Sequence, residues 1–442
     1  MFSQNKFDLN FQPLSMFDKL HITILCFLFN GLCLNAQLEH GTPESVGLDS
    51  KYIQTKVDSI MTLAITKEAF PGAQLLVAKQ GKIIFQKAYG YHTYDGIQKV
   101  SLNDVYDLAS VTKILGPLLA IMKLYEEGKL DLDQPFSTYW KPWRHKKNKR
   151  YITLRELLAH QAGLHPYIVF LNEVIKKGRF KNRFVSHSKN KRFSKQAYNN
   201  VYVKDRFKNK MYRIITRSKV NEKKEYLYSG LASLIYPQLI EDLTGESYTS
   251  YLQNNFYSPL GCNTLGYLPT LKKFPNAMVP TEMDSLFRKD LVKGWVHDEN
   301  AALLGGVSGN AGLFGTAKDL AILMQMYMQK GEYAGKRYLK EETLNEFIKV
   351  QYPENHNRRG LGFDKPLLGN DTLSLKESYP APEVSPESFG HSGFTGTFVW
   401  ADPAHEMVFI FVSNRVYPYR SHSNIYDLNI RPALQQVFYK SD

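Results

Sequence analysis

The period of the hydrophobic and polar positions changes along the chain, from strand-like near both ends to helical in the middle. Residues 72–90 contain two apolar, β-rich runs separated by a turn at residues 79–81, which predicts a β-hairpin. Residues 396–401 and 407–412 repeat this arrangement around a turn at residues 402–405. We expect these distant runs to pair in one sheet.

Helical periodicity predicts five segments: residues 48–66, 152–160, 228–243, 316–329 and 426–438. Thr153 is the expected N-cap of the second segment, and Thr316 with Asp319 looks like a capping box that starts the fourth. Strands near both ends and helices between them predict an α+β (mixed α/β) fold. In this fold an antiparallel sheet built from both termini is flanked by helices, and a mainly helical region is inserted at roughly residues 120–310.

A serine and a lysine precede a long apolar stretch, residues 114–124. Ser110 and Lys113 form an S-x-x-K pair, and a helix that begins near Ser110 would place both side chains on one face. Pro117 would disturb such a helix. Either the helix kinks there, or the apolar helix begins at Pro117 and Ser110 lies on a preceding turn.

This pair has the chemistry of an activated nucleophile. A serine hydroxyl needs an adjacent base to attack a carbonyl group efficiently. A lysine can be that base where burial or neighbouring charges lower its pKa, and an apolar helix start supplies such a setting. The competing interpretation is that Ser110 is an ordinary N-cap residue. Other S-x-x-K matches, at Ser186 and Ser188, lie in a polar, lysine-rich run without an apolar helix behind them.

The N-terminal 36 residues are expected to be a secretory signal with an N-terminal extension. Lys19 precedes an apolar run at residues 20–29, and Ala36 offers a small residue for cleavage. Met16 is an alternative start. The remaining residues, 37–442, are expected to form the catalytic domain, without a transmembrane span.

Export implies a periplasmic or secreted protein. Attachment of a lipid at Cys33 is disfavoured because Leu32 is bulkier than the small residue usual at that position. Cleavage near Ala36 leaves Cys262 as the sole cysteine, in what looks like a tight turn, so no internal disulfide is expected.

The chain of 442 residues is 43% hydrophobic and 22% charged, as in ordinary globular proteins, but its net charge of +14 is unevenly spread. Residues 179–225 contain sixteen lysines or arginines and three acidic residues, so this basic insertion holds nearly all of the net charge. Its aromatic side chains could stack on bases. We favour a solvated insertion whose aromatic residues pack onto the body, followed by weak attraction to anionic envelope polymers, and expect no nucleic-acid partner.

Three short motifs occur in a characteristic order: Ser110-Val111-Thr112-Lys113, Tyr228-Ser229-Gly230 and His391-Ser392-Gly393. In this order they resemble the S-x-x-K, Y-x-N and K/H-x-G motifs of the penicillin-recognising serine hydrolases: class C β-lactamases, D-Ala-D-Ala carboxypeptidases and related esterases. The resemblance extends from about residue 48 to the end of the chain. It implies the β-lactamase/transpeptidase-like fold.

The resemblance also implies roles for these residues. Ser110 would form an acyl-enzyme, and Lys113 and Tyr228 would move protons to and from it. The backbone N–H groups of Ser110 and Phe394 would form the oxyanion hole. His391, Ser392 and Gly393 would bind substrate, with His391 and Ser392 holding a carboxylate or assisting Tyr228.

Two positions depart from the family pattern. Gly230 stands where the family has an asparagine, and His391 replaces the lysine usual in β-lactamases. Both changes lower the expected efficiency of β-lactam hydrolysis, and a histidine charge would depend on pH. The run His297-Asp298-Glu299 is interpreted as a structural or substrate-lining loop, and no metal or other cofactor is expected.

The leading hypothesis is an exported serine hydrolase that cleaves cell-wall peptides as a D-Ala-D-Ala carboxypeptidase, with a small, peptidoglycan-derived peptide as substrate. An esterase or weak β-lactamase of the same fold is the nearest alternative, with a small ester or β-lactam as substrate. A hypothesis from another class is a catalytically inactive envelope-binding protein that uses the basic insertion.

Overall fold

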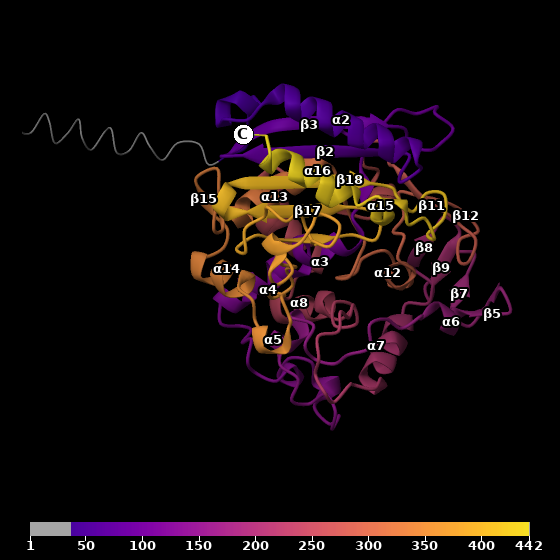
Figure 1. Ribbon diagram of the computed structural model, residues 1–442. Coiled ribbons are helices and arrows are strands. Elements are labelled where there is room, and N and C mark those ends of the chain that lie inside the picture. The colour runs from indigo at the N-terminus through magenta and orange to yellow at the C-terminus, as the bar shows by residue number, and fades with distance from the viewer. Residues whose placement is uncertain (1–36, 442) are drawn as a thin grey trace, which may run out of the picture.

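The computed structural model describes residues 37–441, and its largest sheet has six strands (Figure 1). The strand order is β1-β3-β2-β18-β17-β16. All neighbours are antiparallel except β1 and β3, which run parallel. The strands are β1 (Glu39–His40), β2 (Gly72–Lys79), β3 (Lys82–Gly90), β16 (Phe389–Ser392), β17 (Phe398–Asp402) and β18 (Met407–Ser413). The prediction of a sheet built from both ends of the chain is confirmed.

Both faces of this sheet are covered, as the alternation along β18 shows. Met407, Phe409 and Phe411 lie in one apolar core with the buried faces of α2 (Ser50–Thr66) and α16 (Ile430–Tyr439). The alternate residues of β18 lie in a second, larger core with α13 (Ala317–Met328). Successive side chains of a strand point to opposite faces, so the sheet forms the middle of three layers.

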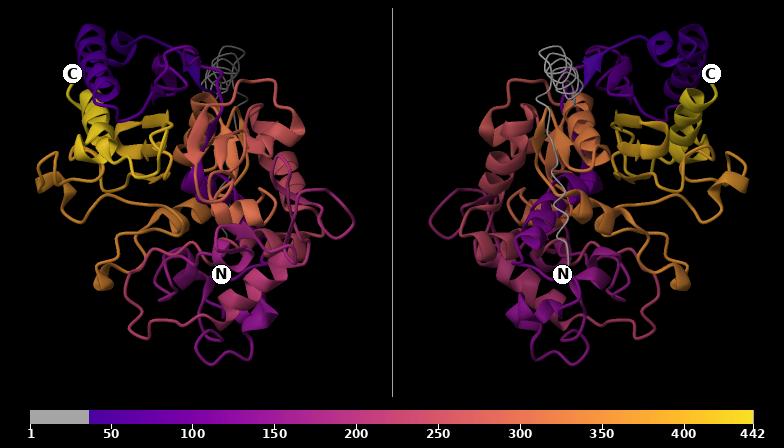
Figure 2. Two further views of the ribbon diagram at one scale, coloured as in Figure 1. Left: turned by 90° about the vertical axis from the view of Figure 1, so that its right-hand side faces the viewer. Right: turned by 90° about the vertical axis from the view of Figure 1, so that its left-hand side faces the viewer.

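The helices and small strands of the middle of the chain lie beyond the α13 face, and the side views in Figure 2 show the indigo and yellow segments together at the other end. The helices are α3 (Thr112–Leu115), α4 (Pro117–Glu126), α5 (Leu154–Leu158), α6 (Leu171–Val174), α7 (Phe207–Arg217), α8 (Tyr236–Thr244), α9 (Tyr248–Leu252), α10 (Ser258–Leu260), α11 (Pro269–Lys272), α12 (Glu299–Leu303) and α14 (Glu341–Ile348). The short helix α15 (Asn424–Asp427) instead lies on the other side of the sheet, in the core with α2 and α16.

Within residues 37–441, twelve short strands form the smaller sheets. They are β4 (Tyr106–Asp107), β5 (Ile175–Lys176), β6 (Arg179–Phe180), β7 (Val185–Ser186), β8 (Lys195–Tyr198), β9 (Val201–Val203), β10 (Gly266–Tyr267), β11 (Pro280–Asp284), β12 (Asp290–Lys293), β13 (Leu313–Gly315), β14 (Glu332–Tyr333) and β15 (Lys336–Arg337). The sheet β10-β13-β4 ends beside the candidate nucleophile, and the sheet β7-β9-β8 lies within the basic insertion.

Several predicted helices are confirmed with shifted ends. Thr153 caps α5 through a complete capping box. The capping box at Thr316 is wrong: Thr316 makes no side-chain cap, because Asp319 instead accepts hydrogen bonds from the backbone and hydroxyl of Thr264. The last helix is interrupted at Asn429, which adopts a left-handed conformation with φ 49°.

The helix expected to begin at Tyr228 begins only at Tyr236, with a proline in its first turn. The residues before it are held in a loop by backbone hydrogen bonds, from Leu227 to the carbonyl of His160 and from Gly230 to that of Pro166. Tyr228 therefore lies on a loop, against the segment that follows α5.

Cys262 is buried after the left-handed turn at Gly261, and burial raises the pKa of its thiol. The prediction of a structural cysteine in a tight turn is confirmed. The expected signal, with Cys26 and Cys33, lies outside the described residues. Among residues 37–441, none of the helices is long and apolar enough to cross a membrane.

Candidate active site

The segment that carries Ser110 is a tight turn between β4 and two short helices. Ser110 is the middle residue of a 3₁₀ turn, Ala109–Val111, and Lys113 belongs to α3. The chain bends at Gly116, where a Cβ atom would lie 2.7 Å from the carbonyl oxygen of Thr112, and α4 then begins at Pro117. Of the two alternatives for Pro117, the one with Ser110 on a turn before the apolar helix is correct.

Lys113 and Ser110 are in direct contact. The ammonium group of Lys113 donates a hydrogen bond to Ser110 Oγ at 2.8 Å and another to the carbonyl oxygen of Asn310 at 3.1 Å. The Lys113 residue is only 8% exposed. The serine hydroxyl thus has an adjacent nitrogen group, held in place by the backbone of Asn310, as an activated nucleophile requires.

Tyr228 joins this pair from its loop. Its side chain is hydrogen-bonded to the side chains of Ser110 and Lys113. The Lys113 ammonium lies 5.4 Å and the Arg359 guanidinium 5.3 Å from the centre of the tyrosine ring. Burial opposes ionisation of the phenol, but the positive charges of Lys113 and Arg359 outweigh it and hold the pKa of Tyr228 below its ordinary value. The phenol therefore ionises more readily than that of a tyrosine in water, and its ionised form can accept a proton.

The end of β16 lies against the nucleophile turn. A Cβ atom on Gly393 would lie 2.7 Å from the carbonyl oxygen of Leu108 and 3.4 Å from Cβ of Ala109, so a glycine is needed for this approach. The hydroxyl of Thr395 donates to the carbonyl of Asp107 at 2.8 Å and fixes the same contact. This brings Phe394, which is 47% exposed, beside the turn that carries Ser110.

His391 presents a hydrogen-bond acceptor to the site. Its Nδ1 must donate to the carbonyl oxygen of Ser392, 2.7 Å away, because a carbonyl only accepts; Nε2 then carries a lone pair and has no partner among the described residues. Burial, followed by the charges of Arg359 and Lys113, lowers the pKa of His391 to about 3. The expectation of a pH-dependent charge is wrong near neutral pH, and a neutral Nε2 acceptor cannot donate to a carboxylate.

The structure does not bring the Ser392 side chain together with this cluster. Ser392 pairs across the sheet with Phe398, whose ring lies in the core under α2 and α16, and its hydroxyl hydrogen-bonds with Tyr379. Neighbouring cross-strand partners point to the same face of a sheet. Its expected contact with substrate is therefore limited to its backbone.

Sequence reasoning missed four residues that surround the cluster: Asn310, His160, Arg359 and Asp364. The ring of His160 lies 4.4 Å from that of Tyr228. Arg359 is 2% exposed and forms an ion pair with Asp364 at 3.4 Å. Asn310 belongs to a glycine-rich segment, residues 305–312, but no motif surrounds Arg359, which reaches the site through folding alone.

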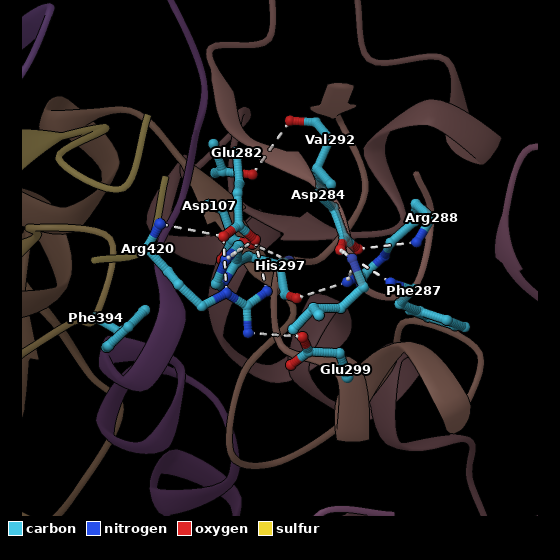
Figure 3. Close-up of polar contacts among 12 residues, drawn as sticks. Asp107, Glu282, Asp284, Phe287, Arg288, Val292, His297, Glu299, Phe394 and Arg420 are labelled. Atoms are coloured by element: carbon cyan, nitrogen blue, oxygen red, sulfur yellow. Dashed lines mark hydrogen bonds and ion pairs between the residues drawn. The ribbon is translucent and has the colours of Figure 1, made fainter. Parts of the chain in front are cut away.

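A buried polar network supports the other side of the nucleophile turn (Figure 3). Asp107 accepts hydrogen bonds from the backbone N–H groups of Ala109 at 2.9 Å and His297 at 2.6 Å. The His297 ring contacts Glu282 at 2.8 Å, and Arg420 donates two hydrogen bonds to the same carboxylate, at 2.7 and 2.6 Å. Despite burial, these hydrogen bonds lower the pKa of Glu282 to about 2.

The three residues of the run His297-Asp298-Glu299 each make a different structural contact. Asp298 caps α12 by accepting from the N–H of Ala301, and Glu299 pairs with Arg420 at 2.9 Å. Within residues 37–441, no cluster of three or more His, Cys, Asp or Glu side chains could hold a metal ion.

A buried lysine that contacts a partly exposed serine and tyrosine beside the end of a β-strand, with the sheet between helical layers, defines a serine hydrolase of the β-lactamase fold. The Beta-lactamase family profile matches residues 51–431, and the chain belongs to this family. This agrees with the resemblance seen in its motifs.

Relatives and solved structures extend the comparison. A Salmonella gallinarum protein provisionally named D-alanyl-D-alanine carboxypeptidase is 28% identical over 422 residues, which cover 88% of each chain. EstCE1, a hydrolase with promiscuous acyltransferase activity, has a TM-score of 0.61 at 18% identity and covers 87% of this chain and 98% of its own. A penicillin-binding protein homologue from Caulobacter crescentus has a TM-score of 0.60 at 17% identity, with coverage of 88% and 99%. The structural likenesses show the shared fold.

Proposed function

We propose that the protein is an exported D-Ala-D-Ala carboxypeptidase-like peptidase that acts through an acyl-enzyme on Ser110. The observation that carries this proposal is the 2.8 Å hydrogen bond between Lys113 and Ser110 Oγ, with Tyr228 beside both. The likeness to the Salmonella protein supports the choice of reaction. The signal-like N-terminus supports export.

In the proposed acylation step, Ser110 Oγ attacks the carbonyl carbon of the scissile peptide bond. Its proton passes to the Lys113–Tyr228 pair, whose tyrosine is prepared for this by the charges of Lys113 and Arg359. The same pair then returns a proton to the leaving amine, and the C–N bond breaks. The acyl group remains on Ser110 as an ester.

The oxyanion of the tetrahedral intermediate would accept hydrogen bonds from the backbone N–H groups of Ser110 and Phe394. The close approach of Gly393 to the nucleophile turn supports this pairing, because it brings the two segments together. In the second step the Lys113–Tyr228 pair would take a proton from water, which attacks the ester carbon. The bond between that carbon and Ser110 Oγ then breaks, the pair returns the proton to Oγ, and the shortened peptide leaves.

One feature of the pocket favours a peptide over an ester. The Nε2 atom of His391 has a lone pair and no partner among the described residues, and its ring lies 6.0 Å from that of Tyr228, near the cations Lys113 and Arg359. A peptide substrate offers N–H groups that such an acceptor can bind, whereas a simple ester has none.

The test combines labelling with substrate release. The mature protein is treated with a fluorophosphonate probe and its intact mass is measured beside a Ser110→Ala control. Release of D-alanine from diacetyl-Lys-D-Ala-D-Ala is then compared with hydrolysis of p-nitrophenyl acetate and a chromogenic cephalosporin. We expect one label on the wild type, none on the control, and D-alanine release that is lost with Ser110.

Each other outcome identifies an alternative. Labelling with ester or cephalosporin turnover but no D-alanine release would contradict the peptidase and identify an esterase or weak β-lactamase. Absence of both labelling and turnover would contradict the enzyme proposal and favour the envelope-binding protein.

A further inference from the structure

Helix α7, in the basic insertion, separates an apolar face from a cationic face. Phe207, Met211 and Ile215 are buried at intervals of four residues. Four basic residues follow one another at intervals of four, three and four positions: Arg206, Lys210, Arg213 and Arg217. Side chains at these intervals lie on one face of a helix, so the four cations form a single stripe about 16 Å long.

This cationic stripe lines a cavity. The cavity has a volume of about 370 Å³, and Arg183 and Lys204, next to β7 and β9, supply two further cations to its wall. The lining also includes Phe184, Phe207 and Ile214 but no acidic side chain. We call it the α7 cavity; its six cations are Arg183, Lys204, Arg206, Lys210, Arg213 and Arg217.

The positive charge of the α7 cavity is largely uncompensated. In the described part of the chain, Lys210 pairs with Glu173 at 2.5 Å, and the other five cations form no ion pair. Like charges at i and i+4 destabilise a helix. An anion bound in the cavity would remove this repulsion, and guanidinium groups bind phosphate oxygens in bidentate fashion.

The aromatic residues argue against a nucleic acid as the ligand. The cations of Arg183 and Lys210 lie 5.3 and 4.6 Å from the centre of the Phe184 ring, and Phe207 packs edge-to-face against it at 5.4 Å. Tyr212 likewise packs against Trp140. These rings are already in contact with protein groups and do not form a free platform for bases.

We propose that the α7 cavity binds a ligand with two or more neighbouring phosphate groups, of the kind that phosphorylated polymers carry. Several guanidinium groups at different heights along one helix match a row of phosphates better than a single ion. This site is separate from Ser110 and its neighbours, and does not depend on the proposed peptidase activity.

Tripolyphosphate is the probe, and isothermal titration calorimetry at low salt is the measurement. We expect it to bind at least tenfold more tightly than inorganic phosphate. The double variant Arg213→Gln/Arg217→Gln should weaken tripolyphosphate binding at least tenfold. The matched control, Lys189→Gln/Lys191→Gln, removes two exposed cations of the same insertion that do not line the cavity, and should weaken binding less than twofold.

Unchanged thermal unfolding midpoints would show that both variants fold. Equal losses of tripolyphosphate affinity in the two double variants would overturn the proposal. They would mean that binding depends only on the net charge of the insertion and not on the cavity. Absence of tripolyphosphate binding to the wild type would overturn it as well. Binding to single-stranded DNA that is tighter than to a polyphosphate of equal charge would replace the phosphate ligand with a nucleic acid.

Discussion

The imidazole of His297 is stacked on the phenyl ring of Phe394, with ring centres 5.7 Å apart and planes inclined by 23°. The backbone N–H of the same histidine donates to Asp107, which also accepts the N–H of Ala109 next to Ser110. His297 therefore contacts both segments that would supply the oxyanion hole. The Arg415 guanidinium covers Phe394 as well, 4.2 Å from its ring centre.

This stack predicts that His297 positions the oxyanion hole. Replacement by leucine should lower kcat about tenfold and leave KM little changed, because oxyanion contacts form mainly in the transition state and small misplacements of them are costly. Steady-state kinetics with the D-Ala-D-Ala peptide measure both constants. His297→Phe, which keeps an aromatic ring on Phe394, should retain more activity than His297→Leu. Equal kcat values in the two variants would argue against a role for the stack.

The two glycines near Ser110 should differ in their tolerance of a methyl group. Gly393→Ala would push a Cβ atom against the carbonyl of Leu108, so we expect a loss of about 1–3 kcal/mol in the free energy of unfolding and a larger loss in kcat. Gly230→Ala is the control, because its nearest neighbour would be Cβ of Asn310 at 4.0 Å. Urea unfolding and D-alanine release measure the two effects. Similar behaviour of the two variants would contradict the close approach at Gly393.

The same open space permits a test of the missing asparagine. Gly230→Asn restores the residue of the family motif at a position where the added Cβ atom meets nothing closer than Cβ of Asn310, at 4.0 Å. A carboxamide there could hydrogen-bond a substrate amide, so we expect cephalosporin hydrolysis to rise severalfold. Kinetics with the chromogenic cephalosporin test this, with Gly230→Ala as the variant that adds bulk without an amide. An equal rise in both variants would exclude the amide as the cause.

The parts of the fold and of the candidate site that could be predicted from the sequence are those that depend on residues close together in the chain. The hairpin turn at Gln80-Gly81, with φ of 53° and 73°, and the apolar strand β18 follow from neighbouring residues, and both were predicted. Tyr228 was found through its motif, but its apolar successors suggested a helix that the backbone contacts of Leu227 and Gly230 prevent.

Long-range contacts account for what was missed. Arg359 lies 131 positions after Tyr228 in the sequence, and its neighbours carry no pattern that indicates an active site. The pKa of His391 depends on burial and on two cations from distant segments, so the histidine in the motif could not reveal that it stays neutral. Asp107 and His297 similarly meet only in the fold.

Arg359 should set part of the pH dependence of catalysis. Its positive charge favours the ionised form of Tyr228, so Arg359→Met should raise the pKa of that phenol. The rising acid limb of the kcat/KM profile would then move to higher pH. Arg359→Lys keeps the charge and should leave the limb closer to that of the wild type. An acid limb at the same pH in all three proteins would mean that Tyr228 does not govern it.

The neutral state of His391 should make the fold sensitive to acid. Its pKa is about 3 in the folded protein, against 6.5 for an unperturbed histidine. Between these values the unfolded chain binds a proton that the folded protein does not, so stability falls as the pH falls below 6.5. From pH 7 to pH 4 this histidine should cost about 3 kcal/mol in the free energy of unfolding.

Urea unfolding at pH 4, 5, 6 and 7 measures this contribution. His391→Asn keeps an N–H donor near the carbonyl of Ser392 but cannot titrate, so its stability should fall about 3 kcal/mol less than that of the wild type over this range. His356→Asn is the control: His356 is exposed, and its left-handed backbone, with φ of 52°, suits asparagine. It should follow the wild type. If His391→Asn also follows the wild type, His391 titrates normally in the folded protein, and the expected lowering of its pKa is contradicted.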